Sequence, residues 1–342
     1  MLSPPPTHVV ATTLGWVALT WHLLRLAKLN NPGLAPGSLW RTLRLFVGKM
    51  RWLRVLRTWY SDTSNPALLE MLSYRPDIVG AVRHPYVNTT WTARRRLRAI
   101  QLHYSLLRGP LEVLRFSPQR QVRVTTLAAG DASLDVILDK PKWFLHEGEV
   151  AINLFRNGQR LYSLVFLLGR SEGCKAAYVG ALQGMGSAQA LDVYRELTHA
   201  LHGLRPRDLL IDAFRVLCRE LGVERIFVVS DHSSMNKSGY FDRIETPTSY
   251  DSAWLEHRGE PAEEGFFELP TASSRRPPDA IPSRKRAQYR RRYEMLDEFD
   301  ALIRTGLRRA QRLTSATSAP AWHDSQDARS DALAVDRPGA QG

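Results

Sequence analysis

Apolar positions in the first 115 residues recur at the three- and four-residue spacing of a helix face. The clearest case is a predicted helix over residues 38–60, in which Leu39, Leu43, Phe46 and Val47 share one side. Arginine and lysine occupy much of the remainder, and three tryptophans lie within it. Such a cationic amphipathic helix either packs as a surface helix with solvated arginines or lies on an anionic membrane surface.

A further helix is predicted over residues 92–107, where several arginines precede His103 and Tyr104. After position 120 the apolar period shortens, and residues 121–127 and 134–138 are predicted to be strands. The N-terminal third is therefore expected to be mostly helical, and the segment that follows it to begin a sheet.

A β-hairpin is the strongest local prediction in the chain. Two apolar runs, 149–156 and 160–168, flank Asn157-Gly158, a dipeptide that favours a type I′ turn. Another strand is predicted over residues 175–182. Gly184-Met-Gly186 then interrupts the apolar pattern.

Two helices and a strand follow these glycines. The helices are predicted over residues 188–202 and 206–221, with Gly203 ending the first and Pro206 suiting the first turn of the second. Residues 225–230 form a short apolar run that leads into Asp231. Beyond it the chain has a loop-like composition.

The last part of the chain holds fewer elements. One more strand is expected around Phe266, and a strongly basic helix over residues 284–304. These patterns predict an α+β protein in which a basic helical N-terminal region precedes a mixed β-sheet with flanking helices. Five parts are expected: an N-terminal helix with its linker (1–37), a basic helical region (38–120), a mixed α/β core (121–270), a basic C-terminal helix (271–312) and a disordered tail (313–342).

Charge is distributed unevenly along these parts. The chain of 342 residues has 47 Lys and Arg against 34 Asp and Glu, a net charge of +13. Residues 1–120 alone carry a net charge of +13, whereas residues 121–270 carry −5. A basic region beside an acidic one suggests an anionic partner for the basic part, or docking of the two regions on each other.

The composition excludes several protein classes. With 44% hydrophobic and 24% charged residues, the chain is neither wholly disordered nor collagenous. Two cysteines cannot form a disulfide scaffold or a four-thiolate zinc site, and we expect no metal. The apolar stretch 9–24 lacks a preceding positive charge, so we expect a buried or interfacial helix, with a membrane span as the alternative.

The order of elements resembles the Gcn-related N-acyltransferase superfamily. The hairpin, strand, glycine break, helices and following strand occur in that family's order, and residues 209–229 resemble its helix and next strand. The resemblance implies a central strand that diverges from its neighbour, with acyl-coenzyme A in the gap. It also implies that the pyrophosphate sits on backbone N–H groups that open a helix.

Two loops are candidates for the phosphates of that coenzyme. One contains Gly203, Arg205 and Arg207, although it has one glycine, and Pro206 removes a donor. The other contains Gly184 and Gly186 before a predicted helix. Each loop is also compatible with an ordinary helix connection.

Acyl transfer needs a base and benefits from an acid. Glu149 and Asp231 are the candidate bases, and Tyr250 is the candidate general acid. Asn153 is a candidate for positioning the substrate. Each of these side chains is also compatible with a turn, cap or packing role.

Several short sequence segments resemble the VirK/YbjX family of Gram-negative bacteria, over roughly residues 40–305. They include His103-Tyr104, which we assign to the substrate, 148–153, 179–184, 197–210, 250–254, 265–270, 281–286 and 290–295. The resemblance implies a role in bacterial virulence and in resistance to antimicrobial peptides at the envelope. It implies no particular reaction.

Two functions from different classes follow. The first is a cytoplasmic protein that supports envelope integrity by acyl transfer from acyl-coenzyme A to an envelope precursor at the inner membrane surface. The second is a non-enzymatic adaptor that binds anionic lipid or an envelope protein through its basic helices. The basic run 284–292 would also suit nucleic acid, but no nucleic-acid motif accompanies it, which disfavours that partner.

Overall fold

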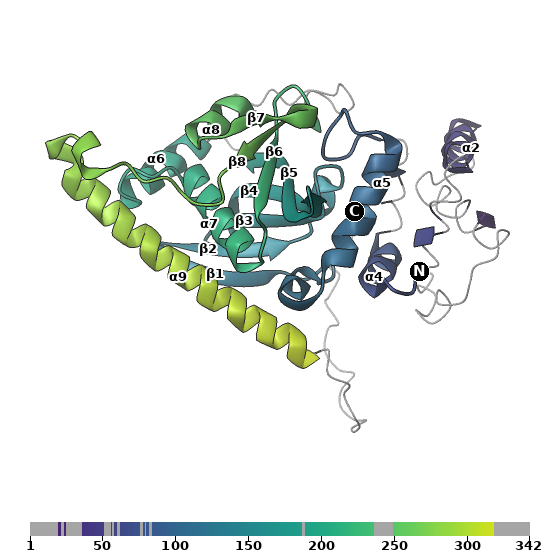
Figure 1. Ribbon diagram of the computed structural model, residues 1–342, viewed down its shortest axis with the longest axis horizontal. Helices are drawn as coiled ribbons and strands as arrows, with labels where there is room; N and C mark the ends of the chain where they lie inside the picture. Colours follow the sequence, from purple (N-terminus) through teal and green to yellow (C-terminus); the bar gives the residue numbers. More distant parts are fainter. Residues whose placement is uncertain are drawn as a thin grey trace, which may run out of the picture.

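The computed structural model describes residues 20, 21, 24, 36–50, 56, 58, 59, 62–75, 78, 80, 81, 84–186, 189–235 and 249–317. The N-terminal part is helical, as predicted, and contains α2 (Pro36–Met50), α4 (Pro66–Tyr74) and α5 (Ala93–Leu106) (Figure 1). The side chains of Asn65 and Thr92 accept hydrogen bonds from N–H groups in the first turns of α4 and α5. Such caps satisfy donors that have no partner within the helix.

The described strands form one eight-stranded sheet in the order β1-β2-β3-β4-β5-β6-β8-β7. Every neighbouring pair is antiparallel except β5 and β6, which are parallel. The strands are β1 (Val122–Ala129), β2 (Ala132–Asp139), β3 (Val150–Arg156), β4 (Gln159–Ser171), β5 (Cys174–Gly184), β6 (Arg225–Val229), β7 (Glu260–Ala262) and β8 (Phe266–Leu269).

The predicted hairpin is confirmed as β3 and β4. Asn157 and Gly158 connect the two strands with φ values of 50° and 76°. A type I′ turn needs positive φ at both central residues, which is why Asn-Gly is favoured there. This turn fixes the register in which Asn153 pairs with Ser163.

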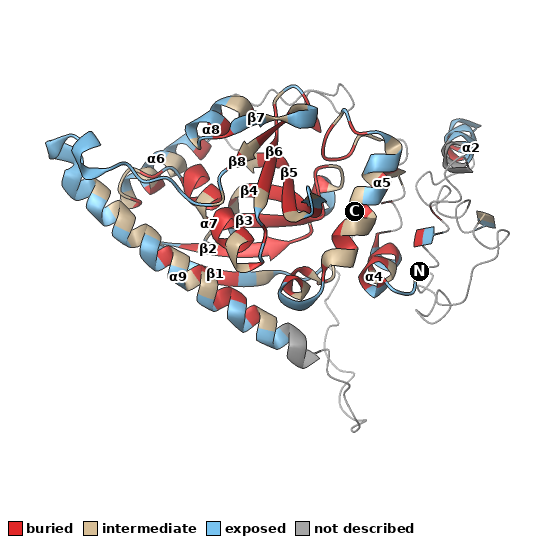
Figure 2. Cartoon of the chain, in the orientation of Figure 1, coloured by how far each residue is buried: buried red, intermediate tan, exposed pale blue. Residues whose placement is uncertain are grey.

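The main hydrophobic core lies between the sheet and the helices that follow or precede it. α5 and α7 (Pro206–Glu220) both pack against β4, and α6 (Ala190–Ala200) precedes α7. Figure 2 shows the central strands β3, β4 and β5 and the inner side of α7 as mostly buried. On the other face, Phe144, Ala151, Val165 and Ala181 form a small separate cluster.

The long helix α9 (Arg286–Thr317) runs along the first strand of the sheet (Figure 1). Phe299, Ile303 and Leu307 are buried on its inner side. At Gly306 a β-carbon would lie 1.8 Å from the carbonyl oxygen of Val124 in β1. α9 therefore covers the outer edge of β1, which would otherwise expose unpaired backbone groups.

The region after Asp231 differs from the expectation of loop with one strand. It contains a helix, α8 (Tyr250–Glu256), and a strand, β7, in addition to the expected strand around Phe266, which is β8. Both missed elements are too short for a periodic pattern to reveal them. Short 3-10 helices complete the description: Gly109–Leu114, Lys142–Phe144, Glu263–Gly265, Pro278–Ala280 and Ser283–Lys285.

Some predictions fall outside the described residues. Most of the apolar stretch 9–24 and residues 318–342 of the predicted tail lie there, whereas residues 313–317, which were predicted to be disordered, belong to α9. Within the described part of the chain, no helix combines the length and apolar character that a membrane span requires.

Candidate functional site

β5 extends beyond the end of its parallel partner β6 (Arg225–Val229), which leaves a gap in the sheet beside the last residues of β5. The two strands pair only from Ala176–Arg225 to Val179–Val228, whereas β5 continues to Gly184 alongside β4. β5 has a bulge at Gly180, directly after its last pair with β6, because Val179 and Ala181 face consecutive residues of β4. A β-carbon at Gly180 would lie 2.1 Å from the carbonyl oxygen of Glu147, so only glycine fits there.

Side chains of α8 fill this gap. The hydroxyl of Tyr250 accepts a hydrogen bond of 3.3 Å from the backbone N–H of Leu182, a residue of β5 beyond its pairing with β6. The indole of Trp254 donates to the carbonyl of Val229 at the end of β6, at 2.8 Å. Tyr250 and Trp254 are 5% and 0% exposed, respectively, so the two rings close the space between the strands.

Asp231 lies at the start of α8, beside Tyr250. Its Oδ1 accepts a hydrogen bond of 3.0 Å from the Tyr250 N–H, and its Oδ2 accepts from the Ser249 hydroxyl. Its own N–H donates to Asp251 at 2.7 Å. The structure therefore brings together two of the predicted catalytic residues, and it gives Asp231 a capping role as well.

The third predicted catalytic residue, Glu149, is enclosed elsewhere. Glu149 is 1% exposed. Its carboxylate pairs with Arg75 at 3.1 Å and accepts hydrogen bonds from the hydroxyls of Tyr86 and Tyr104. Burial and the Glu149 charge raise the pKa of Tyr86 well above its ordinary value. Removing one member of such a buried group leaves the others without a partner, which is costly.

His103 and Lys140 adjoin this enclosed carboxylate. Nδ1 of His103 accepts a hydrogen bond of 3.0 Å from the Leu168 N–H, and burial, followed by the charges of Lys140 and Arg75, lowers the His103 pKa well below its usual value. Burial lowers the pKa of Lys140 to about 8. His103, Tyr104 and Glu149 are thus neighbours, but they belong to the packed interface between α5 and the sheet.

Asn153 occupies a different polar cluster. Its amide donates to Asp139 and to the Ile137 carbonyl, both at 2.9 Å, and its oxygen accepts from Arg160. Asp139 and Arg160 form an ion pair of 2.5 Å. Asn153 is 0% exposed, so it positions Asp139 and Arg160 within the sheet.

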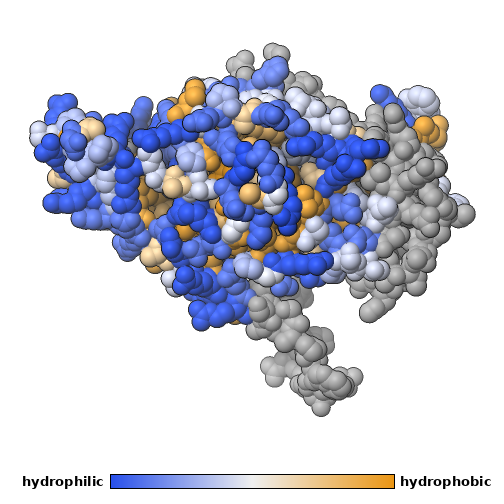
Figure 3. All heavy atoms as spheres, in the orientation of Figure 1, coloured by the Kyte–Doolittle hydropathy of each residue, from blue (hydrophilic) through white to orange (hydrophobic). Residues whose placement is uncertain are grey.

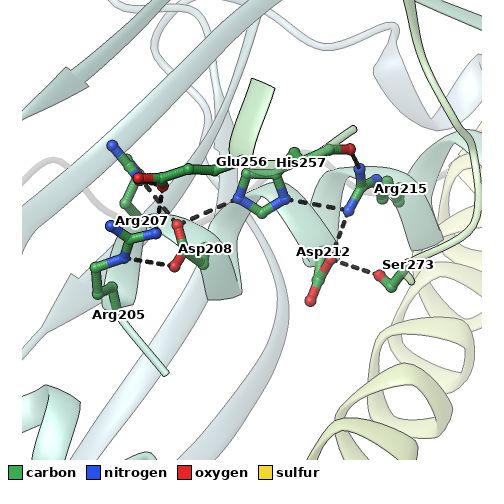
Figure 4. A network of polar contacts seen from close by, with 8 residues as sticks. All are labelled: Arg205, Arg207, Asp208, Asp212, Arg215, Glu256, His257 and Ser273. Carbon is green, nitrogen blue, oxygen red and sulfur yellow. Dashed lines mark hydrogen bonds and ion pairs between the residues drawn. The ribbon is translucent and has the colours of Figure 1, made fainter. Parts of the chain in front are cut away.

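Arg205 and Arg207 lie at the start of α7 and reach toward the end of α8 (Figure 4). Both guanidinium groups bind Glu256, at 2.5 and 2.6 Å, and both also contact Asp208. Burial by itself would raise the pKa of Asp208, but hydrogen bonds and charge from His257 and Arg205 outweigh it and lower the pKa to about 2. The two arginines therefore face carboxylates in this structure.

His257 connects this network to a second ion pair, that of Arg215 and Asp212 (Figure 4). Its Nε2 lies 3.2 Å from Asp208, and its Nδ1 lies 3.3 Å from a guanidinium nitrogen of Arg215. Arg215 is paired with Asp212 at 3.0 Å. His257 therefore bridges the Arg205–Asp208 and Arg215–Asp212 pairs.

This network borders a groove of about 590 Å³ between α7, α9 and the segment after β8. Arginines and acidic side chains from all three elements line it, and Tyr289 and Tyr293 contribute aromatic rings. Arg275 lies over the ring of Tyr293, and Arg276 and Arg292 lie over that of Tyr289. The groove is polar, and most of its arginines already have carboxylate or carbonyl partners.

The two predicted phosphate loops have different surroundings. A β-carbon at Gly203 would lie 2.7 Å from side-chain atoms of Arg292 and Gln288, so α9 covers that loop. A β-carbon at Gly184 would lie 2.8 Å from the Tyr194 hydroxyl and 3.0 Å from the Tyr162 ring, whereas none of the described residues lies within 4 Å of a β-carbon at Gly186. Residues 187 and 188 of this second loop lie outside the described residues.

Glu147 is a buried acidic residue that the sequence patterns did not single out. Its carboxylate oxygen Oε2 is buried and has no hydrogen-bond partner in the described part of the chain. Burial raises its pKa to about 7. A single glutamate before a strand carries no periodic or motif signal, so its burial is visible only in the fold.

Comparison with known proteins identifies the family. A family described as protein of unknown function (DUF535) matches residues 36–305. This chain belongs to the DUF535 family. The result agrees with the resemblance to the VirK/YbjX family, because an uncharacterized protein YbjX of Escherichia coli (strain K12) is 29% identical over 290 residues, covering 80% of this chain and 86% of that protein.

Two further relatives of this DUF535 chain match smaller parts of it. An uncharacterized protein of Haemophilus influenzae is 32% identical over 156 residues, or 45% of this chain and 51% of the relative. A protein of Mannheimia haemolytica named membrane protein LapB is 24% identical over 184 residues, or 52% of this chain and 76% of the relative. No solved structure matches the chain with significance.

Proposed function

We propose that this protein transfers an acyl group from acyl-coenzyme A to an amine or hydroxyl acceptor. The observation that carries the proposal is the position of the Tyr250 hydroxyl at the Leu182 N–H, where β5 extends past its last pair with β6. Divergence of two parallel central strands is the feature that the resemblance to Gcn-related N-acyltransferases implies. The strand order and the bulge at Gly180 support the same proposal.

The proposed chemistry uses residues on both sides of the gap. The acceptor attacks the thioester carbonyl, a bond from carbon to the acceptor forms, and the carbon–sulfur bond breaks. Tyr250 gives its proton to the departing thiolate, and Asp231 takes the proton of the acceptor. Asp231 is favoured over Glu149 as the base because it lies beside Tyr250, whereas Tyr86, Tyr104 and Arg75 enclose Glu149.

The coenzyme needs space that α8 occupies in this structure. Its binding in the gap therefore requires the rings of Tyr250 and Trp254 to move away from β5 and β6. Once Tyr250 has moved, the Leu182 N–H is available to hydrogen-bond the coenzyme. Arg205 and Arg207 are proposed to hold the coenzyme phosphates.

The acceptor is proposed to be an envelope precursor. This part rests on the resemblance to the VirK/YbjX family and on the printed name of the Mannheimia relative, membrane protein LapB. An adaptor that binds anionic lipid is a second candidate, because α2 exposes Leu39, Trp40, Leu43 and Val47 beside its arginines.

The first experiment measures the melting temperature of the purified protein with acetyl-, succinyl- and long-chain acyl-coenzyme A. Free phosphate and an anionic polymer serve as controls, since a ligand that binds only the folded state raises the melting temperature. We expect a shift with one acyl-coenzyme A and none with phosphate. A shift with the polymer alone would remove the proposal and favour the adaptor.

The second experiment tests Tyr250 itself with the donor that binds. Tyr250→Phe keeps the ring and removes the proton, so we expect transfer to fall about 100-fold or more while donor binding persists. Tyr178→Phe is the matched control, because Tyr178 lies in the paired half of β5 and its hydroxyl donates to the backbone carbonyl of Arg170. Equal turnover in the two variants would exclude Tyr250 as the acid.

A further inference from the structure

Hydrogen bonds and ion pairs hold α8 at both ends, while its side chains close the gap beside β5. At its start, Asp231 accepts the Tyr250 N–H. At its end, Glu256 binds Arg205 and Arg207, and the next residue, His257, contacts Asp208. The ion pairs of Glu256 therefore hold in place the helix that carries Tyr250 and Trp254 (Figure 4).

The ion pairs of Glu256 are partly exposed to solvent. The side chains of Arg205 and Glu256 are 49% and 48% exposed, whereas that of Arg207 is 10% exposed. Exposed ion pairs contribute only up to about 1 kcal/mol to stability, because water and salt screen them. A multivalent anion that binds both guanidinium groups can therefore compete with a single carboxylate.

The charges of these side chains favour replacement of the Glu256 carboxylate by an anion. Arg205 and Arg207 are balanced by Asp208 and Glu256, so these four side chains together carry no net charge. Displacement of Glu256 leaves two guanidinium groups against Asp208, which still accepts from Arg205 at 2.6 Å and from His257 at 3.2 Å. The site then carries one positive charge that an incoming phosphate can neutralise.

The site also lies at the end of the sheet where the gap opens. The charges of Arg207 and Asp208 act on the hydroxyl of Tyr162, and Tyr162 pairs with Gly184, the last residue of β5. An anion held by the two arginines is thus near the open end of β5 and near the end of α8. An anion that binds the two arginines therefore lies close to the end of α8 that it would release.

We propose that Arg205 and Arg207 form a diphosphate site that Glu256 occupies in the ligand-free chain, and that phosphate groups displace Glu256 and release α8 from the gap. The inference rests on the proposed function, for which the diphosphate is that of the coenzyme. It assigns Glu256 as an internal competitor, which keeps Tyr250 and Trp254 between the strands until the coenzyme arrives.

The test compares inorganic pyrophosphate, ADP and coenzyme A as ligands of the full chain. Glu256→Gln keeps the shape of the side chain but removes its charge, and we expect it to bind pyrophosphate about 10-fold more tightly than the unaltered chain. Glu260→Gln, an exposed glutamate in β7, is the matched control and should leave the affinity unchanged. Arg205→Gln should weaken binding at least 10-fold.

Release of α8 is measured separately by hydrogen exchange of the Leu182 amide, which donates to Tyr250 in the closed arrangement. We expect exchange to accelerate when pyrophosphate is added, and to be fast in Glu256→Gln without ligand. Unchanged affinity in Glu256→Gln, or unchanged exchange at Leu182 with pyrophosphate bound, would overturn the inference.

The outcomes also separate this inference from the proposed function. If pyrophosphate accelerates exchange at Leu182 but no acyl-coenzyme A binds, the release of α8 stands and the acyltransferase proposal fails. If an acyl-coenzyme A binds and reacts while Glu256→Gln behaves like the unaltered chain, only the role of Glu256 fails. Preference for ADP over coenzyme A would assign the site to a nucleotide instead of the coenzyme and overturn that assignment.

Discussion

At the residue scale, two buried glutamates close together in sequence have opposite surroundings. Glu149 has Arg75, Tyr86 and Tyr104 as partners, so its charge is matched inside the protein. Glu147 has a buried oxygen with no partner in the described part of the chain, and burial raises its pKa to about 7. A matched carboxylate stabilises the fold as an anion, whereas an unmatched one destabilises it once it ionises.

Glu147 therefore predicts a specific dependence of stability on pH. The folded chain keeps the Glu147 proton up to about pH 7, while the unfolded chain loses it near 4.5. Between these values the folded state binds more protons, so the contribution of Glu147 to stability falls as pH rises and is lowest above pH 7. We expect Glu147→Gln to raise the free energy of unfolding at pH 8 by up to about 3 kcal/mol, with little effect near pH 4.

Urea unfolding of both proteins at pH 4, 6 and 8 measures this effect. Glu263→Gln is a suitable control because Glu263 is exposed. An equal difference between Glu147→Gln and the unaltered chain at all three pH values would contradict the prediction, since it would show that ionisation of Glu147 has no influence.

At the scale of elements, α9 depends on one close contact with the sheet edge. Replacing a glycine inside a helix by alanine normally stabilises the helix by about 1 kcal/mol. At Gly306 the added β-carbon would lie 1.8 Å from the backbone carbonyl oxygen of Val124, a contact that neither backbone can accommodate without moving. The tertiary contact therefore outweighs the helix propensity.

We expect Gly306→Ala to lower the free energy of unfolding by about 1–3 kcal/mol, because it separates α9 from β1. Thermal and urea unfolding measure the change. Thr305→Ala, at the exposed neighbouring position of the same helix, should change stability by less than about 0.5 kcal/mol. A stabilised Gly306→Ala variant would show that α9 does not lie against β1 in solution.

At the scale of the whole molecule, positive charge and exposed apolar side chains coincide on α2. The helix exposes Leu39, Trp40, Leu43 and Val47, while the small polar residues Ser38 and Thr42 are buried. Figure 3 shows orange, hydrophobic side chains at the outer surface of the α2 region among hydrophilic ones. α2 also contains no acidic residue, and residues 1–120 carry the net charge of +13.

This arrangement predicts binding to anionic vesicles. We expect the protein to co-sediment with vesicles of phosphatidylglycerol and phosphatidylcholine, to bind pure phosphatidylcholine weakly, and to lose affinity as salt is added. Leu43→Ser should reduce binding several-fold by removing apolar contact, and Leu313→Ser, at an exposed leucine of α9, is the control. Equal binding of the two variants would argue against α2 as the contact.

Local elements were predictable because their signals are contained in short stretches of chain. Asn157-Gly158 determines its own turn, and the alternation between apolar runs and glycines marked β5, α7 and β6 within a few residues of their observed ends. α8 was missed because seven residues provide fewer than two helical turns of pattern.

The candidate site was predictable only as a set of residue types. Tyr250 and Asp231 were selected separately, and the fold places them side by side at the start of α8. Arg205 and Arg207 were selected for anions, but their partner Glu256 lies about 50 positions away and was not considered. Pairing over such separations depends on how α7 and α8 pack, which no local pattern encodes.

The sequence by itself determined the family, the order of elements, the hairpin turn and the concentration of positive charge, because each depends on neighbouring residues or on composition. Only the tertiary structure decided which charges are neutralised and which surfaces are covered. Glu149 became enclosed, Glu147 became unmatched, and Tyr250 and Trp254 came to close the gap between β5 and β6. The physical reason is that burial and pairing are properties of three-dimensional packing, which joins residues far apart in the chain.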